Sequence, residues 1–239
     1  MNRGSTMGKT VAIILAAGRG KRMQAEVAKQ FLLLRGEPIL YHTLKAFEES
    51  CVDEIILVTG KDDMEIVKEI VDRGGFCKVS AVTIGGAERY DSVFEGLKCV
   101  KDADYVLVHD GARPLISAEI IQRNVAALKT DKAVVTAVPS KDTVKISDEK
   151  GYVEDTPNRK FVWSIQTPQS FHTSLIKEAY EKMYLERENL LSAGINITDD
   201  AMVVETFMNE PIKLIMGDYR NIKITTPEDL CVAEVLMRK

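Results

Sequence analysis

The sequence lacks the features that mark secreted, zinc-binding and membrane proteins. Its cysteines are few and far apart, with no Cys-x-x-Cys pair, at Cys51, Cys77, Cys99 and Cys231. This spacing suits neither a disulfide framework nor zinc ligation, so we expect reduced thiols in a cytoplasmic protein. No apolar run is long enough to span a membrane, and the N-terminus has no signal-peptide pattern. We therefore expect no membrane partner, and we interpret residues 1–6 as a leader or a cloning remnant.

Histidine and excess positive charge are scarce as well. None of the three histidines, His42, His109 and His172, has the neighbours that metal ligation requires, and none is predicted to be catalytic. Lys and Arg together number 32 against 36 for Asp and Glu, which gives a formal net charge of −4. Proteins that coat nucleic acid present a basic surface, so this balance predicts no nucleic-acid partner.

The order of apolar and amphipathic segments predicts the fold class. With 239 residues and 45% hydrophobic content the chain can bury a large core, and one domain is expected over 7–239. Strand-like apolar runs occur at 11–17, 54–58, 79–84, 105–109, 133–138 and 213–216, and helical spacing occurs at 38–50, 62–73, 89–101, 117–129 and 173–187. This alternation predicts an α/β fold, a Rossmann-like, three-layer, mostly parallel twisted sheet with helices on both faces.

The most informative stretch is the first apolar run and the loop that follows it. The run is short and rich in β-branched residues, as buried parallel strands are. Gly18 and Gly20 lack a Cβ and allow backbone N–H groups to approach a ligand. Four cations follow, at Arg19, Lys21, Arg22 and Lys29. The loop matches neither the P-loop nor the dinucleotide fingerprint, but glycines beside cations favour a polyphosphate site over a turn with solvated basic residues.

Polar side chains also follow two later strands. Gly86 and Ser92 come after the third apolar run, and Asp110 and Arg113 come after the fourth. Ligands of parallel α/β sheets bind beyond the carboxyl ends of the strands, so these residues are expected to line one site. A carboxylate there can hold a divalent cation or a ribose hydroxyl, and an arginine can bind a phosphate.

The alternation of strands and helices stops between residues 139 and 168. Short alternating runs and a turn at 148–151, without helical spacing, predict a hairpin-like extended β-arm. An arm this polar cannot bury itself on its own sheet, so we expect it to reach a second subunit in a homodimer. Trp163, the only tryptophan, is equally compatible with an interface and with the core.

The C-terminal third contains two helix starts and one isolated lysine. Thr198 is predicted to cap a helix whose first turn holds Asp199 and Asp200. Thr226 is predicted to cap another, because a proline and an acidic residue follow it at the favoured positions. Taken alone, capping explains the two carboxylates, and surface charge explains Lys223.

Short segments in order along nearly the whole chain resemble the cytidylyltransferase family of nucleotidyltransferases. These segments are LAAGRGKRM with Lys29-Gln30-Phe31, GGAERYDSV, HDGARP, DTVK, NRKFVWSIQTPQSF, ITDDA and NIKITTPEDL. Together they are most similar to the 2-C-methyl-D-erythritol 4-phosphate cytidylyltransferase family of the non-mevalonate route to isoprenoids. The resemblance implies transfer of CMP from CTP to 2-C-methyl-D-erythritol 4-phosphate, with release of pyrophosphate and with Mg²⁺ as cofactor.

The resemblance also implies roles for single residues. Nucleotide binding is implied for Ala16, Ala17, Gly18, Gly20, Gly86, Ser92 and Asp110. Substrate binding is implied for Asp110, Arg113, Thr143, Arg159, Thr198 and Lys223, with Thr143 and Arg159 arriving on the arm of a second subunit. Catalysis is implied for Arg22, Lys29, Lys223 and Arg159, and a contact with the phosphate-held metal is implied for Asp110.

The implied chemistry needs no proton-transferring side chain. A phosphate oxygen of the polyol is already an anion, and it can attack the α-phosphorus of CTP in line while cations absorb the developing charge. Three alternatives stay open from the sequence. One is a ribitol-5-phosphate cytidylyltransferase with the same loop and fold. The others are a module that binds CTP without turnover, and an α/β domain that binds a small molecule but no nucleotide.

Overall fold

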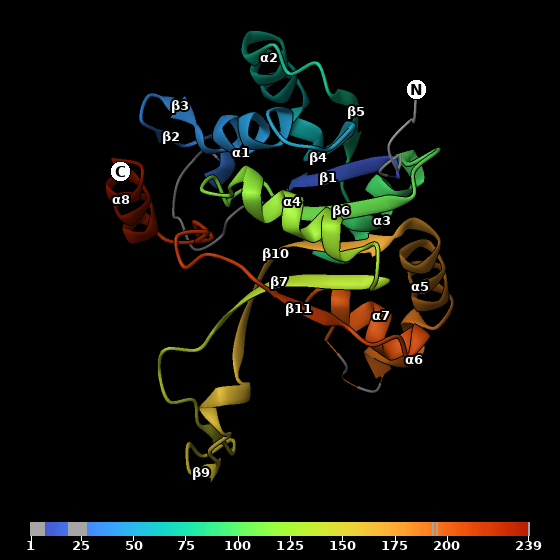
Figure 1. Ribbon diagram of the computed structural model, residues 1–239, viewed down its shortest axis with the longest axis vertical. Coiled ribbons are helices and arrows are strands. Elements are labelled where there is room, and N and C mark those ends of the chain that lie inside the picture. The colour runs from blue at the N-terminus through green and yellow to red at the C-terminus, as the bar shows by residue number, and fades with distance from the viewer. Residues whose placement is uncertain (1–7, 19–27, 193, 195, 239) are drawn as a thin grey trace, which may run out of the picture.

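A central sheet of seven strands carries helices on both faces, and an arm projects from one end of it (Figure 1). The computed structural model describes residues 8–18, 28–192, 194 and 196–238. Within these residues no helix is long and apolar enough to cross a membrane. The Rossmann-like, three-layer α/β fold expected from the sequence is confirmed.

The strand order in the sheet is β11-β7-β10-β6-β1-β4-β5. The strands are β1 Thr10–Ala16, β4 Glu54–Thr59, β5 Val79–Ile84, β6 Tyr105–Asp110, β7 Ala133–Pro139, β10 Trp163–His172 and β11 Lys213–Met216. All neighbours pair in parallel except β10, which is antiparallel to both β6 and β7. Every strand expected from an apolar run is therefore confirmed.

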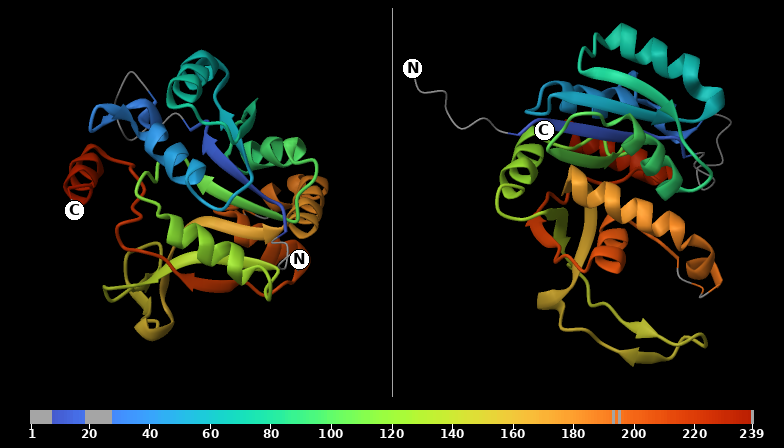
Figure 2. Two further views of the ribbon diagram at one scale, coloured as in Figure 1. Left: turned by 45° about the horizontal axis from the view of Figure 1, so that its top comes forward. Right: turned by 90° about the vertical axis from the view of Figure 1, so that its right-hand side faces the viewer.

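Two helical layers cover the sheet because alternate residues of each strand point to opposite faces. One layer contains α1 Ile39–Glu48, α2 Met64–Gly74 and α4 Ala118–Ala127, and the other contains α3 Arg89–Cys99, α5 Thr173–Leu185 and α7 Asp200–Met208. Ile14 of β1 packs in the core of the first layer, and Ile13 packs in the core of the second. The left view of Figure 2 separates the two layers on either side of the strands.

Shorter elements complete the body of the molecule. They are the 3₁₀ turns η2 Lys29–Phe31 and η3 Lys61–Asp63, the hairpin strands β2 Leu33–Leu34 and β3 Glu37–Pro38, and the helices α6 Arg187–Ser192 and α8 Pro227–Leu236. The C-terminal helix α8 packs beside the β2–β3 hairpin, where Leu34, Ile224 and Ala233 share a small apolar core (Figure 1).

The arm is a short antiparallel hairpin, but it ends earlier than expected. Its strands are β8 Ile146–Ser147 and β9 Val153–Asp155, joined by a turn at the expected place, and the 3₁₀ turn η4 Arg159–Phe161 follows. Residues 163–168, expected in the arm, instead form the first part of β10 in the main sheet. Figure 2 shows the hairpin standing clear of the body.

The start of α7 also differs from expectation. Asp199, and not Thr198, is the N-cap, because an Asp199 carboxylate oxygen accepts a hydrogen bond from the Met202 N–H at 2.9 Å. A carboxylate caps the helix well here, since it both satisfies a free N–H group and opposes the positive end of the helix dipole. Thr198 lies just before the helix, and its hydroxyl donates to Met202 Sδ at 3.8 Å.

Candidate active site

The carboxyl ends of the parallel strands enclose a cavity of about 190 Å³. In the parallel pairing of β1 with β6, Leu15 lies beside Asp110, so the glycine loop after β1 begins close to the Asp110 carboxylate. Predicted site residues that line the cavity are Ala17, Gly18, Lys29, Gly86, Ser92, Asp110 and Lys223. The structure thus brings together residues that are more than 200 positions apart in the chain.

Lys29 is held at the end of β1 by its neighbour Gln30. The buried Gln30 amide donates a hydrogen bond to the Ala16 carbonyl oxygen at 2.6 Å, which fixes η2 against the strand. Ala16 itself does not line the cavity, because its methyl group packs in the core. Gly20 and Arg22, also predicted to bind or activate the nucleotide, lie outside the described residues.

Gly86 and Ser92 form the opposite wall at the start of α3. A capping box between Glu88 and Asp91 fixes this turn, with the Glu88 N–H donating to the Asp91 carboxylate at 3.0 Å. A Cβ on Gly86 would lie 2.3 Å from the Asp91 Cβ, so only glycine fits without a shift of the backbone. This wall is therefore rigid and closely packed.

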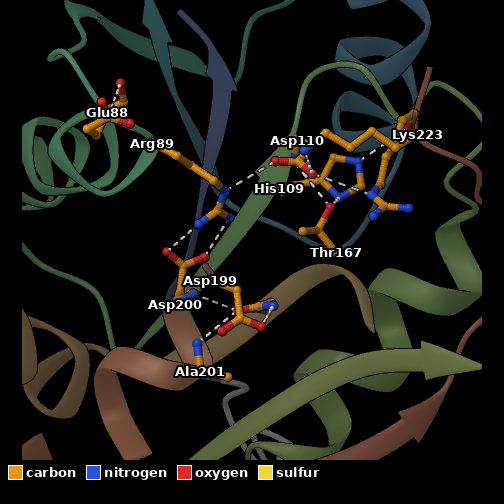
Figure 3. A network of polar contacts seen from close by, with 12 residues as sticks. Glu88, Arg89, His109, Asp110, Thr167, Asp199, Asp200, Ala201 and Lys223 are labelled. Carbon is orange, nitrogen blue, oxygen red and sulfur yellow. Dashed lines mark hydrogen bonds and ion pairs between the residues drawn. The ribbon is translucent and has the colours of Figure 1, made fainter. Parts of the chain in front are cut away.

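Asp110 lies at the centre of a cluster of cations (Figure 3). One carboxylate oxygen is 2.9 Å from Lys223 Nζ and 3.5 Å from Arg113 Nε, and the other is 3.5 Å from Arg89 Nε. Burial by itself would raise the pKa of Asp110, but Lys223, Arg89 and Arg113 hold that pKa well below its usual range. Asp110 is consequently an anion at neutral pH.

Arg89 is held in place from its other side by a buried carboxylate. Its guanidinium donates two hydrogen bonds to Asp200, at 2.8 and 2.7 Å (Figure 3). The Tyr180 hydroxyl donates a third to the same carboxylate at 2.6 Å. Burial alone would lower the pKa of Arg89, but Asp200 and Asp110 raise it well above its usual value. A bidentate pair of this kind fixes the side chain geometrically.

A second cavity, of about 300 Å³, adjoins the first. Its lining includes Arg89, Asp110, Arg113, Thr167, Thr198 and Lys223. Arg89, Asp110 and Lys223 line both cavities, whereas Arg113 and Thr198 line only the second. The predicted nucleotide and substrate residues therefore separate into two adjacent spaces with one common wall.

Arg113 has unused hydrogen-bonding capacity in the second cavity. One of its terminal nitrogens donates to the Asn221 carbonyl oxygen at 2.8 Å. Its Nε is buried and makes no hydrogen bond within the described part of the chain. Lys223 reaches the same cavity because the Ile224 N–H donates to the Ala112 carbonyl oxygen at 2.9 Å, which holds this segment beside the strand end. Anions are the ligands that such donors recognise.

Thr143 and Arg159 line neither cavity of this chain. Both are exposed on the arm, where one terminal Arg159 nitrogen donates to the Lys141 carbonyl oxygen at 3.1 Å. Apart from Ala16, one subunit thus places the other described candidates around the two cavities but leaves Thr143 and Arg159 away from them. Their arrival from a second subunit stays a prediction.

Several residues at the site were not among those predicted. Arg89 lies within the GGAERYDSV segment, so its position beside Gly86 was a usable signal. Gln166 and Thr167 lie within the NRKFVWSIQTPQSF segment, but their place in the main sheet was not expected, because residues 163–168 were predicted to belong to the arm. His109 is fully buried behind Asp110, and burial lowers its pKa to about 3 although Asp110 opposes the shift. The ring is therefore neutral at physiological pH.

Asp110 is the predicted protein contact of a metal ion. Among the described residues, no group of three or more His, Cys, Asp and Glu side chains could hold a metal ion. Asp110 is a single carboxylate on the common wall of the two cavities. Magnesium in nucleotide sites commonly takes one or two carboxylates together with phosphates and water. A single carboxylate, Asp110, therefore suits a Mg²⁺ ion whose other ligands would be nucleotide phosphates and water.

The family model and the relatives that match this chain carry the same protein name. The chain matches the IspD family model, described as 2-C-methyl-D-erythritol 4-phosphate cytidylyltransferase, over residues 10–239. A protein of that name from Lachnoclostridium phytofermentans is 52% identical over 235 residues, which cover 98% of each chain. Another from Alkaliphilus oremlandii is 48% identical over 233 residues, covering 96% of this chain and 95% of the relative.

Solved structures agree with the sequence matches. 4-Diphosphocytidyl-2C-methyl-D-erythritol synthase from Anaerococcus prevotii has a TM-score of 0.83 and 40% identity, covering 97% of this chain and 96% of the other. 2-C-methyl-D-erythritol 4-phosphate cytidylyltransferase from Thermus thermophilus has a TM-score of 0.72 and 29% identity, with 95% and 98% covered. Fold, site and sequence lead to one conclusion, that this chain belongs to the 2-C-methyl-D-erythritol 4-phosphate cytidylyltransferase family.

Proposed function

We propose that the two adjacent cavities carry out the reaction of this family. As a member, the chain is a cytidylyltransferase of the non-mevalonate isoprenoid pathway. It transfers CMP from CTP to 2-C-methyl-D-erythritol 4-phosphate, giving 4-diphosphocytidyl-2-C-methyl-D-erythritol and pyrophosphate. The observation that carries the proposal is the wall of Arg89, Asp110 and Lys223, which both cavities share. A nucleotide in one cavity and a polyol phosphate in the other would meet at this wall.

CTP is assigned to the first cavity. The backbone at Ala17 and Gly18 would approach its phosphates, while Gly86 and Ser92 would face the base. Ala16, Gly20 and Arg22 keep their assigned parts in this loop as predictions. Lys29 supports the assignment, because η2 holds it at the cavity where the phosphates would lie.

The polyol phosphate is assigned to the second cavity. Arg113 would bind its phosphate through its guanidinium group, which lines this cavity, and Thr198 would donate from the opposite wall. Thr143 and Arg159 of a second subunit would close the cavity. Burial of Arg113 supports this assignment, since an ion pair gains strength where water is excluded.

The chemical step is an in-line displacement. A phosphate oxygen of the polyol forms a bond to the α-phosphorus of CTP, and the bond from that phosphorus to the α,β-bridging oxygen breaks. The bonding electrons leave with pyrophosphate. Lys29, Lys223 and Arg22 would stabilise the negative charge that builds on the phosphoryl oxygens. Bound magnesium, with Asp110 as its protein contact, would supply further charge neutralisation.

The homodimer and the cytoplasmic location are parts of the same proposal. Exposed apolar side chains on the arm support a dimer, since such patches mark protein interfaces. All four cysteines are free thiols, which supports a reducing compartment.

Product analysis tests the proposed reaction. The protein is incubated with CTP, 2-C-methyl-D-erythritol 4-phosphate and Mg²⁺, and phosphorus NMR follows the nucleotide. We expect a new diphosphate diester and one pyrophosphate for each CTP consumed. Release of free CMP, or CTP consumption that is independent of the polyol, would contradict the proposal.

A further inference from the structure

The turn at 110–113 carries Asp110 and Arg113, and other elements fix it on every side. The Gly111 N–H donates to the Leu15 carbonyl oxygen of β1 at 2.8 Å. The Thr43 hydroxyl of α1 donates to the Gly111 carbonyl oxygen at 2.9 Å. Two backbone groups at the ends of the turn, the Asp110 N–H and the Arg113 carbonyl, form hydrogen bonds with side chains instead.

Two buried side chains satisfy those end groups. The Asp110 N–H donates to the Thr167 hydroxyl oxygen at 3.1 Å, and His109 Nε2 contacts the Arg113 carbonyl oxygen at 3.4 Å. Thr167 Oγ1 and His109 Nδ1 lie 3.0 Å apart, so the two side chains are also linked to each other (Figure 3). His109 is 0% exposed and Thr167 is 4% exposed, so both side chains that link the ends of the turn are buried.

The direction of each hydrogen bond follows from what each atom can do. The Arg113 carbonyl oxygen only accepts, so Nε2 of His109 must carry the ring proton. In the neutral ring Nδ1 is then an acceptor, and the Thr167 hydroxyl donates to it. The same hydroxyl oxygen accepts from the Asp110 N–H. One continuous chain therefore runs from the first residue of the turn to its last.

We propose that His109 and Thr167 are positioning residues, which hold the 110–113 turn so that Asp110 and Arg113 face the polyol phosphate. This inference rests on the proposed function for the assignment of the second cavity. Neither side chain transfers a proton in the reaction. Arg113 lines only the second cavity, so displacement of the turn weakens polyol binding more than CTP binding.

Thr167→Val and Thr167→Ser test the link. Valine keeps the shape of the side chain and removes the hydroxyl, whereas serine retains it. Loss of the hydroxyl leaves a buried N–H unpaired, so in the valine variant we expect KM for the polyol phosphate to rise about tenfold. KM for CTP should rise less than KM for the polyol phosphate, because Asp110 lines both cavities whereas Arg113 lines only the second, and serine should restore the wild-type values.

His109→Phe tests the other half of the chain. Phenylalanine retains ring packing against Phe47, whose centroid is 5.0 Å away, and removes both ring nitrogens. The matched control is His172→Phe. His172 also contacts a backbone carbonyl oxygen, that of Leu128. It pairs with Tyr105 at the far end of β6, roughly 13 Å along the strand from His109. We expect KM for the polyol phosphate to rise only in the His109 variant.

The ring tautomer gives a readout that does not depend on turnover. Nitrogen NMR of the substrate-free protein should show His109 with its proton on Nε2, and Thr167→Val should disturb the Nδ1 signal. A proton on Nδ1 would overturn the proposal, and so would a folded Thr167→Val protein with unchanged KM for the polyol phosphate. Failure of the wild-type protein to use CTP would refute the proposed function instead. The two failures can be told apart, because the NMR signals of His109 report on the hydrogen-bond chain without any turnover.

Discussion

Asp110 sets the charge balance among the single residues of the site. Its pKa would rise through burial alone, but Lys223, Arg89 and Arg113 lower it well below the usual range. In the unfolded chain an aspartate titrates near pH 3.9, at about its ordinary pKa. Because the folded pKa is the lower one, ionised Asp110 stabilises the fold above about pH 4. That contribution is lost as the pH falls through the folded pKa.

We expect Asp110→Asn to change how stability depends on pH. At neutral pH the variant should be less stable than wild type, because three cations lose their buried anion. The difference in free energy of unfolding should shrink below about pH 4, where unfolded wild type takes up the proton that asparagine cannot bind. Urea unfolding at several pH values measures this difference in free energy of unfolding. Asp102→Asn, at an exposed position, is the control. A difference that is constant with pH would contradict this account.

Lys29→Ala tests the predicted stabilisation of the transition state. Removing one group that stabilises developing charge should reduce kcat by about 100- to 1000-fold, with little change in the melting temperature. Arg22→Ala should behave similarly. Exposed Lys68 on α2 provides the matched control, since Lys68→Ala removes the same charge away from both cavities. Near-normal turnover of Lys29→Ala would remove this residue from the mechanism.

Single residues of the site were predictable where a local pattern marked them. Gly18 and Gly86 follow strands and Asp110 ends one, and strand ends are where α/β folds bind ligands. Thr167 was not predictable, because its role depends on which strand lies beside β6. Burial of Asp200 against Arg89, 111 positions earlier, is likewise a tertiary contact without a local signal.

At the level of elements, α8 is linked to the candidate site through the segment before it. The Asp229 carboxylate accepts hydrogen bonds from the Thr225 N–H, the Thr225 hydroxyl and the Thr226 N–H, at 2.8, 2.8 and 2.9 Å. This cap stiffens the backbone two residues after Lys223. The start of α8 therefore helps to aim the lysine at Asp110.

Asp229→Ala should weaken both the helix and the reaction. Loss of a cap costs about 1 kcal/mol in the free energy of unfolding, measured by urea titration. We expect kcat to fall with it, because Lys223 is less well oriented. Glu228→Ala is the control, since Glu228 is an exposed carboxylate in the same helical turn. Equal effects of the two substitutions would show that general helix charge, and not the cap, is responsible.

Strand β10 shows why one element escaped prediction. Its sequence is polar and contains Pro168, and proline argues against a central strand. The structure accommodates the proline where the pairing with β7 shifts register between Ile165 and Gln169. Buried polar side chains are satisfied by distant partners, as Ser170 is by donating to Asn124 at 2.8 Å. The apolar parallel strands needed no such tertiary contacts and were predicted from sequence alone.

For the whole molecule, the arm is the part whose apolar side chains the chain itself does not cover. Its large apolar side chains are exposed, at Val144, Ile146, Tyr152, Val153 and Phe161. Exposed apolar patches of this kind mark interaction surfaces. The proposed dimer would cover them and would bring Thr143 and Arg159 to the second cavity.

Phe161→Ser should weaken the dimer and the activity together. Phe161 is 73% exposed, so in a monomer the substitution removes little packing and should leave the melting temperature nearly unchanged. Leu185→Ser on α5, at an 86% exposed site away from the arm, is the control. Sedimentation and turnover are measured on the same samples. A monomeric variant with full activity would exclude a site shared between subunits.

The most direct test of the whole account is substrate choice. Pyrophosphate release is measured with CTP and Mg²⁺, with 2-C-methyl-D-erythritol 4-phosphate and ribitol 5-phosphate compared at equal concentration. We expect a strong preference for 2-C-methyl-D-erythritol 4-phosphate. A preference for ribitol 5-phosphate would contradict the assigned substrate while keeping the mechanism, and release with neither would contradict the catalytic role itself.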